Sequence, residues 1–278
     1  MLDLSSFTAP KRQPFRAIFQ GIQGIGKTSV AAYAPNAVII PVEDGVPEGL
    51  PCKVAPRIEN HAQFFQTLEF LWQAEHPFET VIIDSLDWLE RVVVWPRTIE
   101  FHNATHNLNP DDPKAWKSIE QGYNAGFIEA AANVWPQVIN ALDCLVNDRG
   151  LNIIFTAHPV KFKVEPPDTD PYQTYGLGIN KHARGIVRDW AWLVGHIQQE
   201  VTVTTKVEDK GFGQTKEHAR GIATGSRVMY TQPRPAWEAK NRYSMPEKII
   251  LPDDDIQGSW NAIETAIRGE QTQTQEAA

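Results

Sequence analysis

Short apolar runs alternate along most of the chain with longer segments in which apolar residues recur every three or four positions. The apolar runs that predict buried strands lie at 14–20, 37–42, 80–84 and 151–157. Asn60 is placed to cap a helix whose apolar residues are Phe64, Phe65, Leu68, Leu71 and Trp72. Because strands that alternate with helices form parallel βαβ units, the pattern predicts an α/β fold: a mostly parallel central sheet covered by helices.

The remaining segments complete the predicted order of elements. A helix follows the third strand to about residue 99, a polar stretch at 102–114 interrupts the pattern, and a helical region at 127–147 restarts at Pro136. Residues 159–180, rich in Pro, Asp, Gly and Tyr, predict a long loop. The last elements are expected to be a fifth strand at 190–195, antiparallel edge strands at 201–206 and 227–231, and a helix at 258–268.

Composition and charge narrow the class of protein. The 278 residues are 42% hydrophobic, which suits one domain at 14–268, preceded by an extended lead-in at 1–13 and followed by a polar, disordered tail at 269–278. The net charge of −8 excludes a strongly basic surface overall, so nucleic acid would contact only a few loops or an oligomer. Cys52 and Cys144 lack metal-site spacing and indicate reduced thiols of a cytoplasmic protein, and no apolar run predicts a membrane span.

Residues 21–28, GIQGIGKT, match the phosphate-loop pattern G-x-x-x-x-G-K-[ST] in full. An apolar strand precedes them and a predicted helix at 27–34 follows, which is the context that the pattern requires. Backbone N–H groups of such a loop surround phosphates, Lys27 reaches the β- and γ-phosphates, and the Thr28 hydroxyl binds Mg²⁺. The sequence therefore predicts an ATP site with Mg²⁺ whose nucleotide-contacting residues are Gly21, Gln23, Gly24, Ile25, Gly26, Lys27, Thr28 and Ser29.

Carboxylates end two of the predicted strands. Asp84 closes an apolar strand, where it either holds Mg²⁺ through water or simply caps the following helix; the phosphate loop favours the metal role. Ser85 follows it, so the general base is not the next residue. Glu43 ends the second strand and is the candidate base that deprotonates the attacking water, with Asp44 as the competing carboxylate.

Three other residues are candidates for sensing or stabilising the γ-phosphate. His158 ends the fourth predicted strand, which we expect between the phosphate-loop strand and the Asp84 strand, and there it is either a γ-phosphate sensor or a structural histidine. Lys240 and Arg242 are spaced i, i+2, so on an extended segment they point the same way. They suit an arginine-finger role supplied by a neighbouring subunit, and the alternative is a solvated basic turn.

A nucleic-acid contact is a further prediction. Cations that neutralise phosphates, interleaved with aromatic rings that stack on bases, suit single-stranded nucleic acid. The alternative is that Arg184 lies on a solvated helix face and the tyrosines pack in the fold. The candidate DNA-binding residues around the expected long loop are Lys161, Lys163, Tyr172, Tyr175, Lys181 and Arg184.

Taken together, these residues resemble a family: the phage-encoded RecA-like P-loop ATPases, which include the Sak-type single-strand annealing proteins. The resemblance covers about residues 14–252. It rests on the phosphate loop, Glu43, Asp84, the pairs Ala157-His158 and Gly122-Tyr123, and the segments Lys117–Glu120, Arg188–Ala191 and Lys240–Arg242. Lys240-Asn241-Arg242 is also similar to the Lys-Asn-Arg motif at the subunit interface of RadA-type ATPases.

The resemblance implies a RecA-like core that hydrolyses ATP and binds or anneals single-stranded DNA. It also implies a single-strand-binding protein as partner, self-association into a ring or filament in which Lys240 and Arg242 act in trans, and a place in the host cytoplasm. Two other classes stay open. A P-loop small-molecule kinase needs an arginine-rich lid, and residues 102–126 contain no arginine. An ATP-switched partner protein, such as a helicase loader, needs only nucleotide binding.

Overall fold

The computed structural model describes residue 7 and residues 13–209 and 215–269. The predicted lead-in at 1–13 and tail at 269–278 therefore lie almost wholly outside the described residues. Within the described part, none of the helices is long and apolar enough to cross a membrane.

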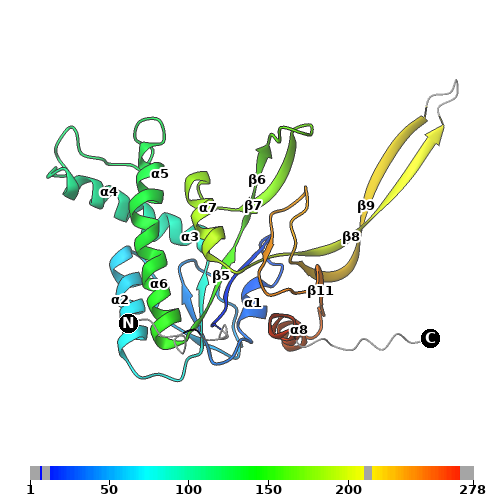
Figure 1. The fold of residues 1–278 in the computed structure, drawn as a ribbon, viewed down its shortest axis with the longest axis horizontal. Coiled ribbons are helices and arrows are strands. Elements are labelled where there is room, and N and C mark those ends of the chain that lie inside the picture. Colours follow the sequence, from blue (N-terminus) through cyan, green and yellow to red (C-terminus); the bar gives the residue numbers. More distant parts are fainter. Residues whose placement is uncertain (1–6, 8–12, 210–214, 270–278) are drawn as a thin grey trace.

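A nine-stranded sheet forms the centre of the molecule (Figure 1). The strand order is β11-β9-β8-β1-β5-β4-β2-β3, and β10 pairs with β8. The pairs from β8 to β3 are parallel, whereas β9, β10 and β11 pair antiparallel. The strands are β1 (Arg16–Gly21), β2 (Ala37–Pro41), β3 (Lys53–Val54), β4 (Thr80–Asp84), β5 (Asn152–Ala157), β8 (Leu193–Asp209), β9 (Thr215–Tyr230), β10 (Lys240–Asn241) and β11 (Lys248–Leu251). The predicted parallel sheet with antiparallel strands at its C-terminal edge is confirmed.

Helices cover both faces of this sheet, because the central strands are apolar on both sides. One core cluster joins the sheet to α2, α3, α6 and α7, and the second joins it to α1 and α8. Two π-helical turns, η2 and η3, come directly before α4 and α6, each of which has a proline in its first turn, so the break or restart predicted at Pro136 falls where η3 meets α6. The bounds are α1 (Lys27–Ala31), α2 (His61–Gln73), α3 (Leu86–Leu89), η2 (Glu90–Val94), α4 (Trp95–Thr105), α5 (Ala125–Glu129), η3 (Ala130–Val134), α6 (Trp135–Arg149), α7 (Lys181–Trp190) and α8 (Ile256–Arg268).

The prediction of a long loop at 159–180 is wrong. Two strands, β6 (Pro159–Val164) and β7 (Tyr172–Leu177), pair there as a separate antiparallel hairpin. Apolar and basic residues alternate from Val160 to Val164, which is the period of a strand, and the Pro- and Asp-rich turn that follows obscured it. The fifth strand was also placed too early: Trp190 ends helix α7, and β8 begins at Leu193.

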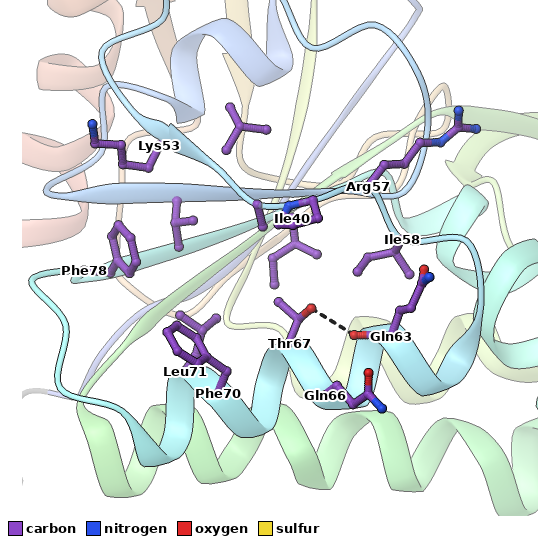
Figure 2. Close-up of a pocket in the computed structure, with 14 residues that line it drawn as sticks. Ile40, Lys53, Arg57, Ile58, Gln63, Gln66, Thr67, Phe70, Leu71 and Phe78 are labelled. Carbon is purple, nitrogen blue, oxygen red and sulfur yellow. Dashed lines mark hydrogen bonds between the residues drawn. The ribbon is translucent and has the colours of Figure 1, made fainter.

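The two edges of the sheet differ. At one, β8 and β9 continue beyond the body of the domain as a long antiparallel ribbon (Figure 1). At the other, the short strand β3 lies above helix α2, and a cavity of about 500 Å³ opens between them (Figure 2). Val54 and Phe70, which line it, are 51% and 60% exposed. This edge therefore combines a strand that pairs on one side only with exposed apolar side chains.

Candidate nucleotide site

The phosphate loop connects β1 to α1, and glycine is required at several of its positions. Gly24 and Gly26 have φ angles of +79° and +93°, a region that other residues rarely adopt. A Cβ atom on Gly21 would lie 2.5 Å from the carbonyl oxygen of Ile197 in β8. The neighbouring strand therefore packs directly against the start of the loop.

Arg227 supports the loop from behind, a role that the sequence did not reveal. This residue of β9 is 8% exposed, and its guanidinium donates to the carbonyl oxygens of Ile25 (3.2 Å) and Pro252 (3.0 Å) and to Ser259 Oγ (3.3 Å). A Cβ atom on Gly26 would lie 2.2 Å from Arg227 Nη1. The only signal in the sequence is a charged residue directly before an apolar strand segment.

The side chain of Lys27 is buried in the loop that it follows. Its Nζ donates to the carbonyl oxygens of Gly21 (2.8 Å) and Ile22 (3.0 Å). Burial lowers the pKa of Lys27, against the opposing attraction of Asp84 and Glu43. In this structure the ammonium group therefore bonds to carbonyl oxygens of the phosphate loop itself.

Asp84 faces the phosphate loop. Its Oδ2 accepts a hydrogen bond from Thr28 Oγ1 at 3.0 Å, and its Oδ1 accepts one from Thr156 of β5. Ser85, not Asp84, is the residue before helix α3, so the side chain of Asp84 is not a helix cap. A hydroxyl and a carboxylate are oxygen ligands that suit Mg²⁺, so the residues present fit that ion.

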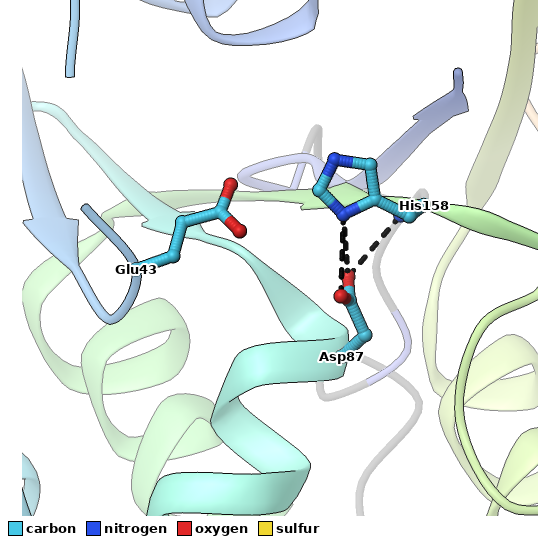
Figure 3. A group of neighbouring side chains, drawn as sticks. All are labelled: Glu43, Asp87 and His158. Atoms are coloured by element: carbon cyan, nitrogen blue, oxygen red, sulfur yellow. Dashed lines mark hydrogen bonds and ion pairs between the residues drawn. The ribbon is translucent and has the colours of Figure 1, made fainter. Parts of the chain in front are cut away.

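The carboxylate of Glu43 points toward His158 (Figure 3), and both residues line the same cavity. Its backbone N–H donates to the carbonyl oxygen of Asp84 at 3.2 Å, which fixes the end of β2 beside β4. A cavity of about 330 Å³ contains Glu43, His158 and the phosphate-loop residues. Burial, together with the charges of Asp84 and Asp87, raises the pKa of Glu43. Asp44 also lines this cavity, but it is exposed and pairs with Arg57 at 2.5 Å.

His158 has a partner that the sequence analysis missed. Its Nδ1 lies 3.1 and 3.2 Å from the two carboxylate oxygens of Asp87, and its backbone N–H donates to Asp87 Oδ1 at 3.2 Å (Figure 3). The hydrogen bond from Nδ1 raises the pKa of His158. Burial by itself would raise the pKa of Asp87, but the bonds from His158 outweigh it and lower that pKa. The sequence contained one indication of this contact: Asp87 follows Asp84 by three residues, in the first turn of helix α3.

Donor atoms of Glu43, Asp87 and His158 lie within 4.8 Å of one another. Asp87 and His158 already hydrogen-bond to each other, and the predicted Mg²⁺ ligands, Thr28 and Asp84, lie outside this group.

The β6–β7 hairpin is tied to the same helical segment at both of its ends. His158 immediately precedes β6 and bonds to Asp87; three residues farther along the helix, Glu90 accepts hydrogen bonds from the backbone N–H of Asn180 at 2.9 and 3.1 Å. Gly178 N–H also donates to the carbonyl oxygen of His158 at 2.9 Å. Burial raises the pKa of Glu90 to about 7. The helical segment α3–η2 therefore contacts both the candidate nucleotide site and the hairpin.

The candidate DNA-binding residues divide between two faces of the hairpin. Lys161 and Tyr175 are cross-strand partners, with Nζ 5.4 Å from the ring centroid, and Lys163 lies on the same face with an ion pair to Glu165. Tyr172 pairs with Val164 on the other face.

The two remaining DNA candidates belong to helix α7. Lys181 is exposed at its first turn. Arg184 is already engaged: its guanidinium lies 4.1 Å from the Phe162 ring and donates to the carbonyl oxygens of Leu177 and Ile179. Burial lowers the pKa of Arg184. The basic residues most available on the hairpin are therefore Lys161 and Lys163.

Lys240 and Arg242 do not reach the phosphate loop of their own chain. Lys240 pairs with Val194, which pairs with Ile18 in the middle of β1, whereas the loop starts at the end of that strand. The Lys240 ammonium donates to two carbonyl oxygens at the end of α7, both at 2.8 Å. Arg242 is exposed, and its backbone N–H donates to Trp192. A role in trans stays a prediction.

The strand order and the site together define a class. Strand β5 lies between the phosphate-loop strand β1 and the Asp84 strand β4, with β2 and its Glu43 next along, as predicted. This is the architecture of a RecA-like P-loop core. Residues 13–243 match the family model described as an AAA domain, and the chain belongs to that family.

Two solved structures resemble the fold. The crystal structure of the RadB recombinase has 10% sequence identity and a TM-score of 0.44, and the alignment covers 86% of this chain and 89% of that one. The flagellar accessory protein FlaH from Methanocaldococcus jannaschii has 10% identity and a TM-score of 0.36, with 86% and 90% covered. Among curated proteins, no sequence matches this chain.

Proposed function

We propose that this protein hydrolyses ATP with Mg²⁺ and couples hydrolysis to the binding or annealing of single-stranded DNA in phage recombination. The observation that carries the proposal is that His158, at the nucleotide cavity, directly precedes the hairpin with the basic and aromatic residues. Both hairpin ends bond to one helical segment that follows Asp84. A change at the γ-phosphate would therefore act directly on the proposed DNA surface.

In the proposed reaction, Thr28 would bind Mg²⁺ directly and Asp84 would hold it through water, and the ion would neutralise developing charge on the phosphates. Lys27 binds the β- and γ-phosphates. Glu43 accepts the proton of the attacking water, and its raised pKa makes it a stronger base than an ordinary carboxylate. His158 contacts the γ-phosphate from the far side of the cavity.

The first prediction concerns DNA stimulation. ATP turnover is expected to rise when single-stranded DNA is added, and this stimulation is expected to fall as the salt concentration increases. Lysine side chains that bind DNA phosphates release counterions from the DNA, and added salt opposes that release. Lys27→Ala serves as the blank.

Replacing both Lys161 and Lys163 by alanine is expected to lower the slope of log Kd against log salt concentration by about 1 to 2. Fluorescence anisotropy with a labelled oligonucleotide measures Kd at each salt concentration.

A double variant of Lys114 and Lys248 is the matched control, since both lysines are exposed and lie far from the hairpin in sequence, and Lys248, like Lys163, forms a surface ion pair. Equal losses of DNA affinity in the two double variants would show that the hairpin is not the DNA-binding surface. Turnover indifferent to DNA at every salt concentration would favour the ATP-switched partner protein instead.

Self-association is the second part of the proposal. The exposed edge at β3 and the placement of Lys240 and Arg242 away from their own phosphate loop are both compatible with a neighbouring copy. A neighbour that supplies Lys240 or Arg242 would complete the site by stabilising transition-state charge. A single-strand-binding protein is the further partner that we propose for DNA bound in this way.

Mixing two inactive variants tests this arrangement. Lys27→Ala retains its finger residues, and Lys240→Ala retains its phosphate loop. In random assemblies of equal amounts, about a quarter of the interfaces would combine the two intact halves, so up to about a quarter of wild-type turnover is expected to return. A steady-state ATPase assay across mixing ratios measures it; turnover that stays at the level of the separate variants at every ratio would contradict action in trans.

A further inference from the structure

The hydrogen bond between Asp87 and His158 connects the helix that follows Asp84 to the end of β5. Asp87 lies in the first turn of α3, three residues after Asp84, and is 9% exposed. Its two carboxylate oxygens lie almost equally far from His158 Nδ1, at 3.1 and 3.2 Å, and Oδ1 also accepts the backbone N–H of His158. Such a carboxylate fixes both the position of the histidine backbone and the rotation of its ring.

The geometry also determines which nitrogen of the His158 ring is left for a second hydrogen bond. With Nδ1–H donated to Asp87, the second nitrogen, Nε2, points away from the carboxylate (Figure 3). His158 lines the cavity that contains Lys27 and Glu43. A carboxylate on one side of an imidazole sets its tautomer and favours its protonated form, which presents an N–H donor on the other side.

We propose that Asp87 is a positioning residue for ATP hydrolysis, which holds His158 as an imidazolium donor aimed at the γ-phosphate. The inference rests on the proposed ATPase function. The charged groups that face His158 are Asp87 on α3, Lys27 on α1 and Glu43 after β2. Asp87 and Glu43 favour the protonated ring, whereas Lys27 and burial oppose it. Loss of Asp87 removes the largest of the favourable interactions.

A purely structural explanation is available for comparison. An acidic residue in the first turn of a helix stabilises that helix by its interaction with the backbone dipole. In that case Asp87→Asn would lower thermal stability and, by removing the hydrogen bond to Nδ1, lower the pKa of His158, but it would leave the pH dependence of turnover unchanged. The two explanations therefore predict different measurements.

The test combines a titration with a pH–rate profile. The pKa of the His158 ring is measured by NMR in the wild type and in Asp87→Asn, with His158→Gln used to assign its signal among the eight histidines. We expect this pKa to fall by about one unit in Asp87→Asn. With saturating ATP, the decline of kcat at high pH is expected to move to lower pH by a similar amount, while KM changes little.

A double-mutant cycle separates the pair from independent effects. If Asp87 acts through His158, adding Asp87→Asn to His158→Gln lowers kcat no further, because the two residues contribute as a unit. An unchanged His158 pKa, or kcat losses that multiply in the double variant, would overturn the inference. The NMR titration needs no turnover. A wild type without ATPase activity would therefore refute the proposed function, whereas an unshifted titration would refute the pairing of Asp87 with His158.

Discussion

Replacing Glu43 by glutamine is expected to lower kcat for ATP hydrolysis by about 10²- to 10⁴-fold, because the amide cannot accept the proton of the attacking water. Glu43 faces the cavity beside the phosphate loop, and burial together with neighbouring carboxylates raises its pKa. Glutamine has nearly the same shape, so the affinity for ATP should be retained. A steady-state ATPase assay and a fluorescent-nucleotide titration measure the two quantities separately.

Asp44→Asn is the matched control for Glu43→Gln. Asp44 is the adjacent carboxylate, but it is exposed and paired with Arg57. Its replacement should change turnover by less than about fivefold, since an exposed ion pair contributes at most about 1 kcal/mol. Wild-type turnover in Glu43→Gln, or a larger loss of turnover in Asp44→Asn than in Glu43→Gln, would show that Glu43 is not the base.

Replacing Arg227 by methionine is expected to lower the free energy of unfolding by about 2 to 5 kcal/mol and to weaken nucleotide binding. The guanidinium is buried and donates to the Ile25 carbonyl in the phosphate loop and to the Pro252 carbonyl before α8. Methionine fills a similar volume but leaves these acceptors without a donor. Chemical denaturation measures the stability, and nucleotide titration of the folded fraction measures binding.

Arg234→Met provides the control, because Arg234 is exposed and forms a surface ion pair with Glu247. It should change stability by at most about 1 kcal/mol. If Arg227→Met were as stable as Arg234→Met and bound nucleotide normally, the phosphate loop would not depend on this arginine.

Much of the architecture was accessible from the sequence because it is local. Strands β2, β4 and β5 are apolar runs, and their boundaries agree with the structure within one residue. The hairpin β6–β7 was not predicted because turn residues hide its pairing, and the start of the fifth strand was wrong because the apolar residue Trp190 ends helix α7 instead of beginning β8. In both cases a local pattern was compatible with two structures, and only packing selects between them.

The nucleotide site shows the same division between local pattern and tertiary contact. By itself the sequence determined the phosphate loop, because eight consecutive residues carry both the backbone conformation and the chemistry, and it indicated Glu43, Asp84 and His158 because strand ends in a parallel sheet meet at one edge. Only the tertiary structure decided that Asp87 holds His158 and that Arg227 supports the phosphate loop. These contacts join residues 71 and 202 positions apart. Their energies depend on burial and mutual distance, and neither quantity is a property of a local sequence pattern.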